Sequence, residues 1–196
     1  MTTDPTVLIQ FADWLQHAGG VPESEALRVA ERGEVRQFSA GAVLFSAGDV
    51  LETLYFIRSG LIRFFYLTPE GKEFNKNFVT AGNVATSLGS FLEARPSPFF
   101  AEALEETELV ALPMAFVRDL KTSDIAWERL INGFVIRLAL QKERREASFL
   151  LESATERYEA FLTEFAEILG RVPQYHIASY LGITPVALSR IRARRS

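Results

Sequence analysis

The chain has 196 residues, of which 48% are hydrophobic and 23% charged, and its 21 Lys and Arg against 25 Asp and Glu give a net charge of −4. This composition fits one large folded domain or two small ones, and it excludes a disordered chain and a general polyanion binder. Cysteine is absent, which excludes disulfides, thiolate zinc sites, cysteine-ligated iron–sulfur clusters and thiol nucleophiles. The two histidines, His17 and His176, lie near opposite ends, so we expect no His-rich metal site.

The charge is distributed unevenly along the chain. Residues 171–196 contain five Arg and no Asp or Glu, a local charge of +5, whereas the remaining residues carry 16 basic and 25 acidic groups, a local charge of −9. An acidic body with a basic end indicates a protein that touches nucleic acid with one part only. No apolar run is long enough to span a bilayer, and no secretory signal is visible at the start, so we expect a cytoplasmic protein.

The first thirty residues predict two helices, separated by Gly19 and Gly20 and with Pro22 opening the second. From Val35 to Leu112 short β-rich runs alternate with glycines, the pattern of a small antiparallel barrel or sandwich. Thr68 to Gly71, with the sequence TPEG, is a strong turn signal between two of these strands. We interpret the many aromatic residues here as barrel core, with ligand stacking as the alternative.

Residues 123–159 predict a long helical segment, followed by a further amphipathic helix from Tyr158 to Leu169. The long segment carries two apolar stripes, so both of its faces need to be buried. We expect one face to lie on the barrel and the other on a second copy of the same helix, with burial of both faces within one chain as the alternative. The first stripe, which we assign to the dimer helix, is Trp127, Ile131, Phe134 and Leu138, and the second is Ile136, Leu140, Ala147 and Leu151.

The sequence from Gln174 to Arg192 predicts a helix-turn-helix. A short helix is stopped by Gly182, which permits the positive φ of a tight turn, and a second helix starts with Thr184 as N-cap and Pro185 in its first turn. Ala178 is small where the two helices cross, and apolar residues on both helices lock the pair together. In this arrangement the second helix enters the DNA major groove.

The exposed side of the second helix supplies the predicted DNA contacts. We assign Arg190 to a base edge, Val186 to an apolar contact such as a thymine methyl, and Ser189 to a phosphate or a base. The arginines that follow are expected to meet phosphates and to give salt-sensitive affinity. The predicted DNA-binding residues are Thr184, Pro185, Val186, Ser189, Arg190, Arg192, Arg194 and Arg195.

The order of these parts resembles the CRP/FNR family of bacterial transcription regulators. The resemblance is carried by residues 40–74, which are similar to the cyclic-nucleotide-binding roll, and by IASYLGITPVALSRIR at 177–192. It implies an α+β fold with an N-terminal double-stranded β-roll (1–122), a long dimerisation helix (123–152) and a C-terminal helical helix-turn-helix domain (153–196). It further implies a homodimer on a two-fold symmetric site in double-stranded DNA, with RNA polymerase as a further partner and no membrane.

This chain departs from the cyclic-nucleotide-binding pattern at the phosphate cassette. In an ungapped register Ser87 stands where the family has the ribose Glu, and Ser97 and Pro98 stand where it has the phosphate-binding Arg-Ser pair. Without that cation a buried phosphate loses its bidentate partner, so we expect no tight cAMP site. Arg95 would reach the site only if the loop were rearranged. The expected effector-pocket residues are Thr86, Ser87, Leu88, Gly89, Arg95, Ser97 and Pro98.

These features favour a dimeric DNA-binding regulator whose effector is unknown and is not a conventional cyclic nucleotide. The absence of Cys argues against the iron–sulfur and haem mechanisms of the family, so no cofactor is expected. The alternative is a module for small-molecule sensing, a cyclic nucleotide included, or for protein interaction, with degenerate DNA binding. An enzyme is not expected, because no Ser-His-Asp set or P-loop is present and the carboxylates of Glu102, Glu105, Glu106 and Glu108 fall on a strand and its turn.

Overall fold

The computed structural model describes residues 5–194, which form two compact units. The first unit comprises the residues up to Phe64 together with 78–136, and the second comprises 65–77 together with the residues from Arg137 onward. Strands β4 and β5 and helix α5 contribute residues to both units. Within the described part of the chain, no helix has the length and apolar character needed to cross a membrane.

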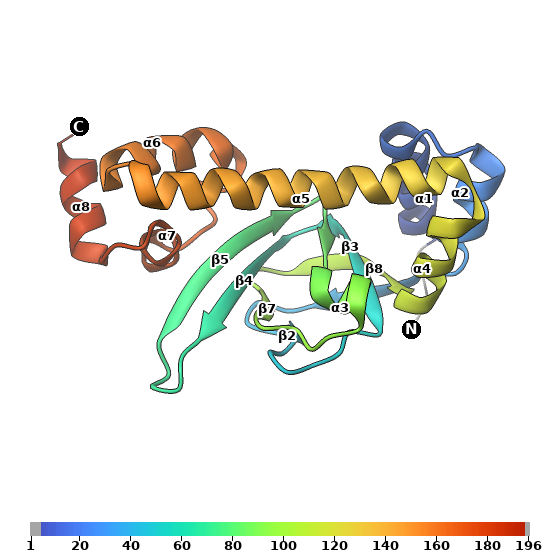
Figure 1. Ribbon diagram of the computed structural model, residues 1–196, viewed down its shortest axis with the longest axis horizontal. Helices are drawn as coiled ribbons and strands as arrows, with labels where there is room; N and C mark the ends of the chain where they lie inside the picture. The colour runs from blue at the N-terminus through green and yellow to red at the C-terminus, as the bar shows by residue number, and fades with distance from the viewer. Residues whose placement is uncertain (1–4, 195–196) are drawn as a thin grey trace. The chain divides into compact units, whose positions relative to one another are not determined.

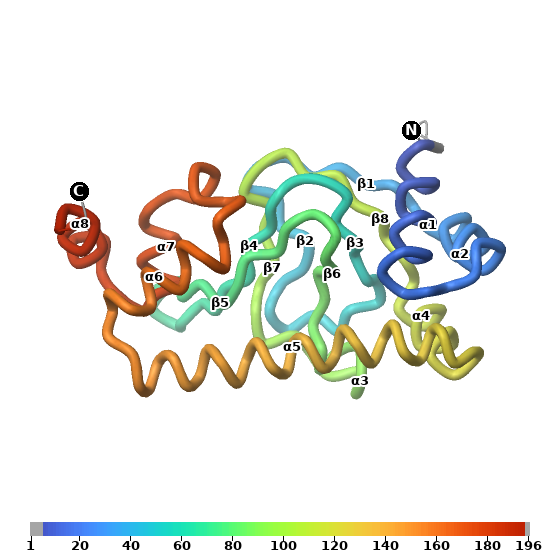
Figure 2. Tube along the Cα trace, turned by 90° about the horizontal axis from the view of Figure 1, so that it is seen from above, coloured from blue at the N-terminus to red at the C-terminus, as the bar shows by residue number. Residues whose placement is uncertain are grey.

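The first unit is a β-roll with helices before and after it (Figures 1 and 2). Its helices are α1 (Pro5–Gly19), α2 (Glu23–Ala30), α3 (Leu88–Glu93), α4 (Met114–Ser123) and the first part of α5 (Ile125–Leu151). Its strands are β1 (Glu34–Phe38), β2 (Val43–Phe45), β3 (Thr53–Ser59), β4 (Leu61–Leu67), β5 (Glu73–Thr80), β6 (Val84–Ala85), β7 (Phe100–Ala103) and β8 (Thr107–Pro113).

The strands form two four-stranded sheets, in the orders β1-β8-β3-β6 and β2-β7-β4-β5. Strand β8 pairs antiparallel with both β1 and β3, so that Val110 lies opposite Val35 on one side and Phe56 on the other. The predicted antiparallel roll is therefore confirmed, and the TPEG turn joins β4 to β5 as expected.

The roll interior is filled by aromatic side chains. The rings of Phe45, Phe64 and Phe99 lie with centroids 5.0 to 6.0 Å apart, and all three residues are buried. These distances are those of favourable aromatic pairs, which supports the interpretation of these residues as core.

The second unit is helical apart from the tip of the β4–β5 hairpin. It contains the second part of α5, α6 (Ala154–Glu164), a 3-10 turn (Ala166–Ile168), α7 (Gln174–Leu181) and α8 (Pro185–Ala193). Its core includes an aromatic cluster in which the rings of Phe161, Phe165 and Tyr180 lie 5.0 to 5.5 Å apart.

The helix boundaries between residues 151 and 169 differ from the sequence prediction. The long helical segment ends at Leu151, and the next helix starts at Ala154 rather than Tyr158 and ends at Glu164 rather than Leu169. The cause is a capping box: the Ser153 side chain accepts from the Glu156 N–H, and the Glu156 carboxylate accepts from the Ser153 N–H at 2.7 Å. This reciprocal pair fixes a new helix start.

Candidate nucleic-acid interface

Helices α7 and α8 form the predicted helix-turn-helix. The Thr184 hydroxyl accepts from the Ala187 N–H at 3.1 Å, which caps α8, and Pro185 is its first residue. Gly182 ends α7 with φ +69°, and the Ile183 N–H donates to the Ala178 carbonyl at 3.0 Å, the bond of a glycine-terminated helix end. The local signals in the sequence therefore specify both ends of the turn.

Helix α8 has one buried side and one exposed side. Leu188 and Ile191 are buried, whereas Val186 is 61% exposed and Ser189 and Arg190 follow it at three and four positions, which places the three on one face. Every predicted DNA-binding residue that the structure describes is exposed: Thr184, Pro185, Val186, Ser189, Arg190, Arg192 and Arg194. Arg195 lies outside the described residues.

The first helix of the motif is held by the tip of the β4–β5 hairpin. The Asn75 amide donates to the His176 carbonyl at 2.9 Å and lies 3.0 Å from His176 Nδ1, and its backbone N–H donates to Ser179 Oγ at 2.9 Å. Asn75 and His176 are 3% and 5% exposed. His176 is therefore a buried packing residue, whereas its neighbour Tyr175 is 58% exposed.

Two arginines bind the carbonyl end of α7. Arg145 donates to the Tyr180 carbonyl at 2.9 Å and to the Asn75 carbonyl at 3.2 Å, and its guanidinium lies 3.8 Å from the centroid of the Tyr180 ring. Arg157 donates to the Leu181 carbonyl at 3.2 Å. Cations at a helix C-terminus satisfy the unpaired carbonyls there. Arg145 is therefore a packing residue of the second unit, although it lies in the charged stretch of residues 141–146.

The same region affects two titrations. Burial, together with the nearby charges of Lys142 and Arg145, lowers the pKa of Lys76 to about 8. Burial also raises the pKa of Tyr180, against the opposing effect of Arg145. Lys76 therefore loses its charge at a lower pH than an exposed lysine, and above that pH it adds little to the positive potential of the second unit.

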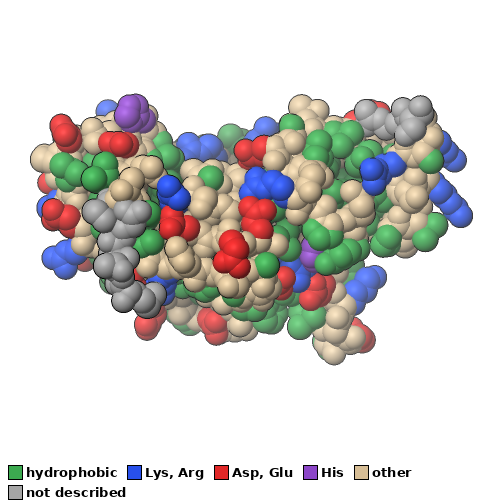
Figure 3. Space-filling view, turned by 180° about the vertical axis from the view of Figure 1, so that it is seen from behind, with side chains coloured by type: hydrophobic (Ala, Val, Ile, Leu, Met, Phe, Trp, Pro, Cys, Tyr) green, Lys and Arg blue, Asp and Glu red, His purple; other side chains and the backbone are tan. Residues whose placement is uncertain are grey.

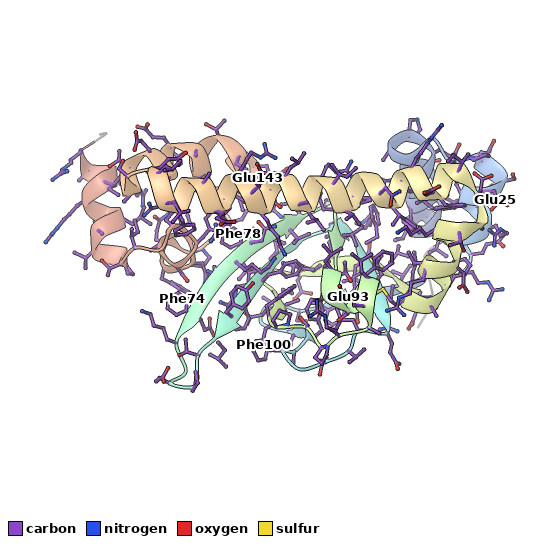
Figure 4. The ribbon with its side chains drawn as sticks, viewed as in Figure 1. Glu25, Phe74, Phe78, Glu93, Phe100 and Glu143 are labelled. Atoms are coloured by element: carbon purple, nitrogen blue, oxygen red, sulfur yellow. The ribbon has the colours of Figure 1, made fainter. Side chains whose placement is uncertain are left out.

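The expected effector loop carries no cation that faces the roll interior. Ser87 and Ser97 are buried, and the Ser97 hydroxyl donates to the Phe99 carbonyl at 2.8 Å. Arg95 is exposed and forms an ion pair with Glu93, which Figure 4 labels on α3. The other residues of this set are Thr86, Leu88, Gly89 and Pro98. The Thr86 hydroxyl is buried and has no hydrogen-bond partner among the described residues, whereas Pro98 is exposed.

The two stripes of α5 differ in what covers them. Trp127 and Ile131 are 3% and 8% exposed and belong to the core of the first unit, and Phe134 packs partly buried against it. Of the four residues assigned to the dimer face, Trp127 and Ile131 are therefore covered within the first unit, and Leu138 is intermediate. The second stripe is exposed: Ile136 (57%), Leu140 (50%), Ala147 and Leu151 (84%).

Acidic and basic side chains are intermixed over the roll on the face shown in Figure 3. The first unit carries surface ion pairs, such as Arg58 with Glu108 at 2.8 Å. By contrast, residues 171–196 contain no acidic residue. The α8 end of the second unit is therefore the candidate contact for a polyanion.

Comparison with known proteins agrees with this architecture. The cyclic nucleotide-binding domain family matches residues 35–124. The fumarate and nitrate reduction regulatory proteins of Vibrio cholerae and Escherichia coli are each 30% identical, over 79% of this chain and 65% of their own length. Over the matched residues the chain is therefore similar to regulators of the FNR type.

Solved structures share the fold at lower identity. FixK2 from Bradyrhizobium japonicum superposes with a TM-score of 0.74 at 18% identity, covering 83% of each chain. A CRP/FNR regulator from Eubacterium rectale superposes with a TM-score of 0.72 at 16% identity, covering 93% of this chain and 87% of that one. The chain spans 65% of the length of the curated relatives named above.

Proposed function

We propose that this protein is a homodimeric, sequence-specific DNA-binding transcription regulator of the CRP/FNR family. The observation that carries the proposal is α8, which buries Leu188 and Ile191 and exposes Val186, Ser189 and Arg190 on one face of a capped helix. A helix presented in this way fits the major groove, where Arg binds guanine O6 and N7. The relatives named as fumarate and nitrate reduction regulatory proteins support the same function.

The direct test is selection of duplex DNA from a random library by the purified protein, followed by sequencing. Enrichment of a two-fold symmetric motif is the expected result, because a symmetric dimer presents two copies of α8. If no motif is enriched with or without cell extract, the proposal fails and the alternative of a sensing or interaction module with degenerate DNA binding takes its place.

Arg190→Ala is expected to weaken binding to the selected site by about 10- to 100-fold, because one bidentate base contact contributes about 1–3 kcal/mol of discrimination. Binding to random-sequence duplex, measured by fluorescence anisotropy in the same buffer, serves as the control. An equal loss on both duplexes would show that Arg190 meets the backbone rather than a base.

The double variant Arg194→Ala, Arg195→Ala is expected to flatten the salt dependence of DNA binding. Each lost phosphate contact lowers the slope of log K against log [salt] by about 0.9, so the slope should fall by up to about 2. Titrations at several salt concentrations measure this slope directly. An unchanged slope would place both arginines away from the phosphates.

The second apolar stripe of α5 is the proposed dimer surface. Ile136→Glu is expected to weaken self-association at least tenfold, because it replaces about 1.5–3 kcal/mol of apolar burial with a carboxylate that has to be desolvated. Ile9→Glu on α1 is the matched control, because Ile9 is exposed to nearly the same extent as Ile136, 54% against 57%. Sedimentation equilibrium measures both, and equal behaviour of the two variants would reject this surface.

We also propose that the effector is not a conventional cyclic nucleotide and that the protein needs no iron–sulfur or haem cofactor. Two observations support the first point: Arg95 faces solvent in an ion pair with Glu93, and the rings of Phe45, Phe64 and Phe99 occupy the roll interior. Calorimetry with cAMP tests whether the effector is a cyclic nucleotide. Saturable cAMP binding at micromolar concentration would overturn this part of the proposal.

A further inference from the structure

The first unit contains an apolar cavity outside the expected effector loop. It lies between helices α1, α2, α4 and α5 and strands β3, β6 and β8, and its empty space is about 470 Å³, counting the part open to solvent. Residues 86–98, the expected effector loop, contribute none of its lining.

The sequence builds this cavity from the outward face of one sheet and from the helices packed on it. Leu54 and Phe56 alternate with Tyr55 along β3, so their side chains point to the same face. Opposite them, Phe11 and Trp14 come from consecutive turns of α1. The far wall consists of residues from three successive turns of α5: Trp127, Ile131 and Phe134.

The cavity has a buried end and a partly exposed mouth. Phe11 and Trp127 are 2% and 3% exposed, whereas Trp14, Leu54 and Phe134 are of intermediate exposure. The Trp14 ring lies 5.6 Å from that of Phe134 and 4.5 Å from that of Phe56. A molecule at this mouth therefore lies against aromatic rings.

We propose that this cavity binds a small, neutral, apolar molecule of one ring. The described residues that line it present only apolar surface to the empty space. A carboxylate or phosphate placed there would lose its hydration without gaining a partner, and apolar cavities of this kind accept benzene-like molecules rather than water. Aromatic walls add edge-to-face and stacked contacts that favour a ring over a linear hydrocarbon.

This site does not depend on DNA binding, and it differs from the expected effector loop in both place and ligand chemistry. Because three turns of α5 line the cavity, a bound molecule stabilises the packing of that helix on α1 and the roll. A ligand that binds only the native state stabilises it by RT ln(1 + [L]/Kd), so the melting temperature keeps rising with ligand concentration.

The chain offers a direct readout, since its two tryptophans, Trp14 and Trp127, both line the cavity. Bromobenzene, whose heavy atom quenches indole fluorescence on contact, is the probe. We expect saturable quenching of the full chain, reversed by toluene, which has a similar shape and no heavy atom. We also expect toluene to raise the melting temperature by a few degrees. Quenching that rises linearly with bromobenzene, with no toluene effect, would overturn the proposal.

Leu54→Phe tests the location of the site. The added ring fills the mouth, and because Leu54 is partly exposed the larger side chain has room to adjust. We expect at least tenfold weaker bromobenzene binding, with no change for the matched control Leu92→Phe on α3, where the leucine is 49% exposed and lines no part of the cavity. Equal binding by both variants would place the ligand elsewhere. Val84→Phe on β6 repeats the test if Leu54→Phe does not fold.

Discussion

Arg145→Met is expected to lower the free energy of unfolding of the second unit by about 3 kcal/mol and to weaken DNA binding with it. The variant keeps an apolar stem but removes two charged hydrogen bonds, to the carbonyls of Tyr180 and Asn75, each of which contributes about 1.5–3 kcal/mol. It also removes cation–π contacts with Tyr180 and Phe149, at 3.8 and 4.8 Å, of about 0.5–2 kcal/mol each. Because these contributions share one side chain, they are not additive.

Amide hydrogen exchange of α7 measures this prediction without assuming that the whole chain unfolds in one step. Arg144→Met is the matched control, because it removes the same charge from the adjacent position, where the side chain is exposed and makes only a 3.4 Å bond to the Leu140 carbonyl. We expect α7 amides to exchange about 100-fold faster in the Arg145 variant and to change little in the Arg144 variant. Equal effects would mean that only the lost charge matters, not the contacts.

The helix-turn-helix could be predicted from the sequence because its determinants are local. Each of them acts within two or three residues of its own position. Gly182 adopts the left-handed conformation, the Thr184 side chain caps α8, and the Pro185 ring fixes φ in its first turn. The strands of the roll were predicted for a similar reason, since each is short and is bounded by turn residues. The capping box at Ser153 and Glu156 is equally local and was present in the sequence, so the late start predicted for α6 was avoidable.

The contacts that hold α7 could not be predicted, because their partners are far away in the chain. Asn75 and His176 are 101 residues apart, and Arg145 reaches Tyr180 across 35 residues. Arg145 also stands among five other charged or polar residues at 141–146, a composition that is typical of an exposed helix face. Only tertiary structure separates this arginine from Arg144 beside it.

The covering of the two stripes of α5 could not be predicted from the sequence either. Periodicity indicates that both are apolar but does not say which one the chain covers by itself. The tertiary structure buries Trp127 and Ile131 against α1 and the roll and leaves Ile136 and Leu140 exposed. The self-association surface assigned from the sequence therefore includes two residues that the chain itself covers, and we propose the second stripe in its place.

Gly182→Ala is expected to cost the second unit about 2–4 kcal/mol and to reduce DNA binding in parallel. An L-residue at φ +69° loses about 1–2 kcal/mol relative to glycine. In addition, a Cβ at this position would lie 2.7 Å from Cε1 of Phe149, so the ring would have to move, and such overpacking costs about 1–3 kcal/mol. The ring is not free to move without loss, because Arg145 and Arg157 lie over it at 4.8 and 5.1 Å.

Two comparisons separate these causes. Gly20 in the first unit also has a positive φ, +62°, but an added Cβ would meet nothing within 4 Å. Gly20→Ala therefore measures the loss of stability that comes from the backbone conformation alone, about 1–2 kcal/mol. Gly182→Ala in a Phe149→Ala background removes the contact with the ring, so its cost should fall to that of Gly20→Ala. Hydrogen exchange reports each unit separately. If the cost at Gly182 stays above that of Gly20 without the ring, the turn between α7 and α8 is constrained by something other than Phe149.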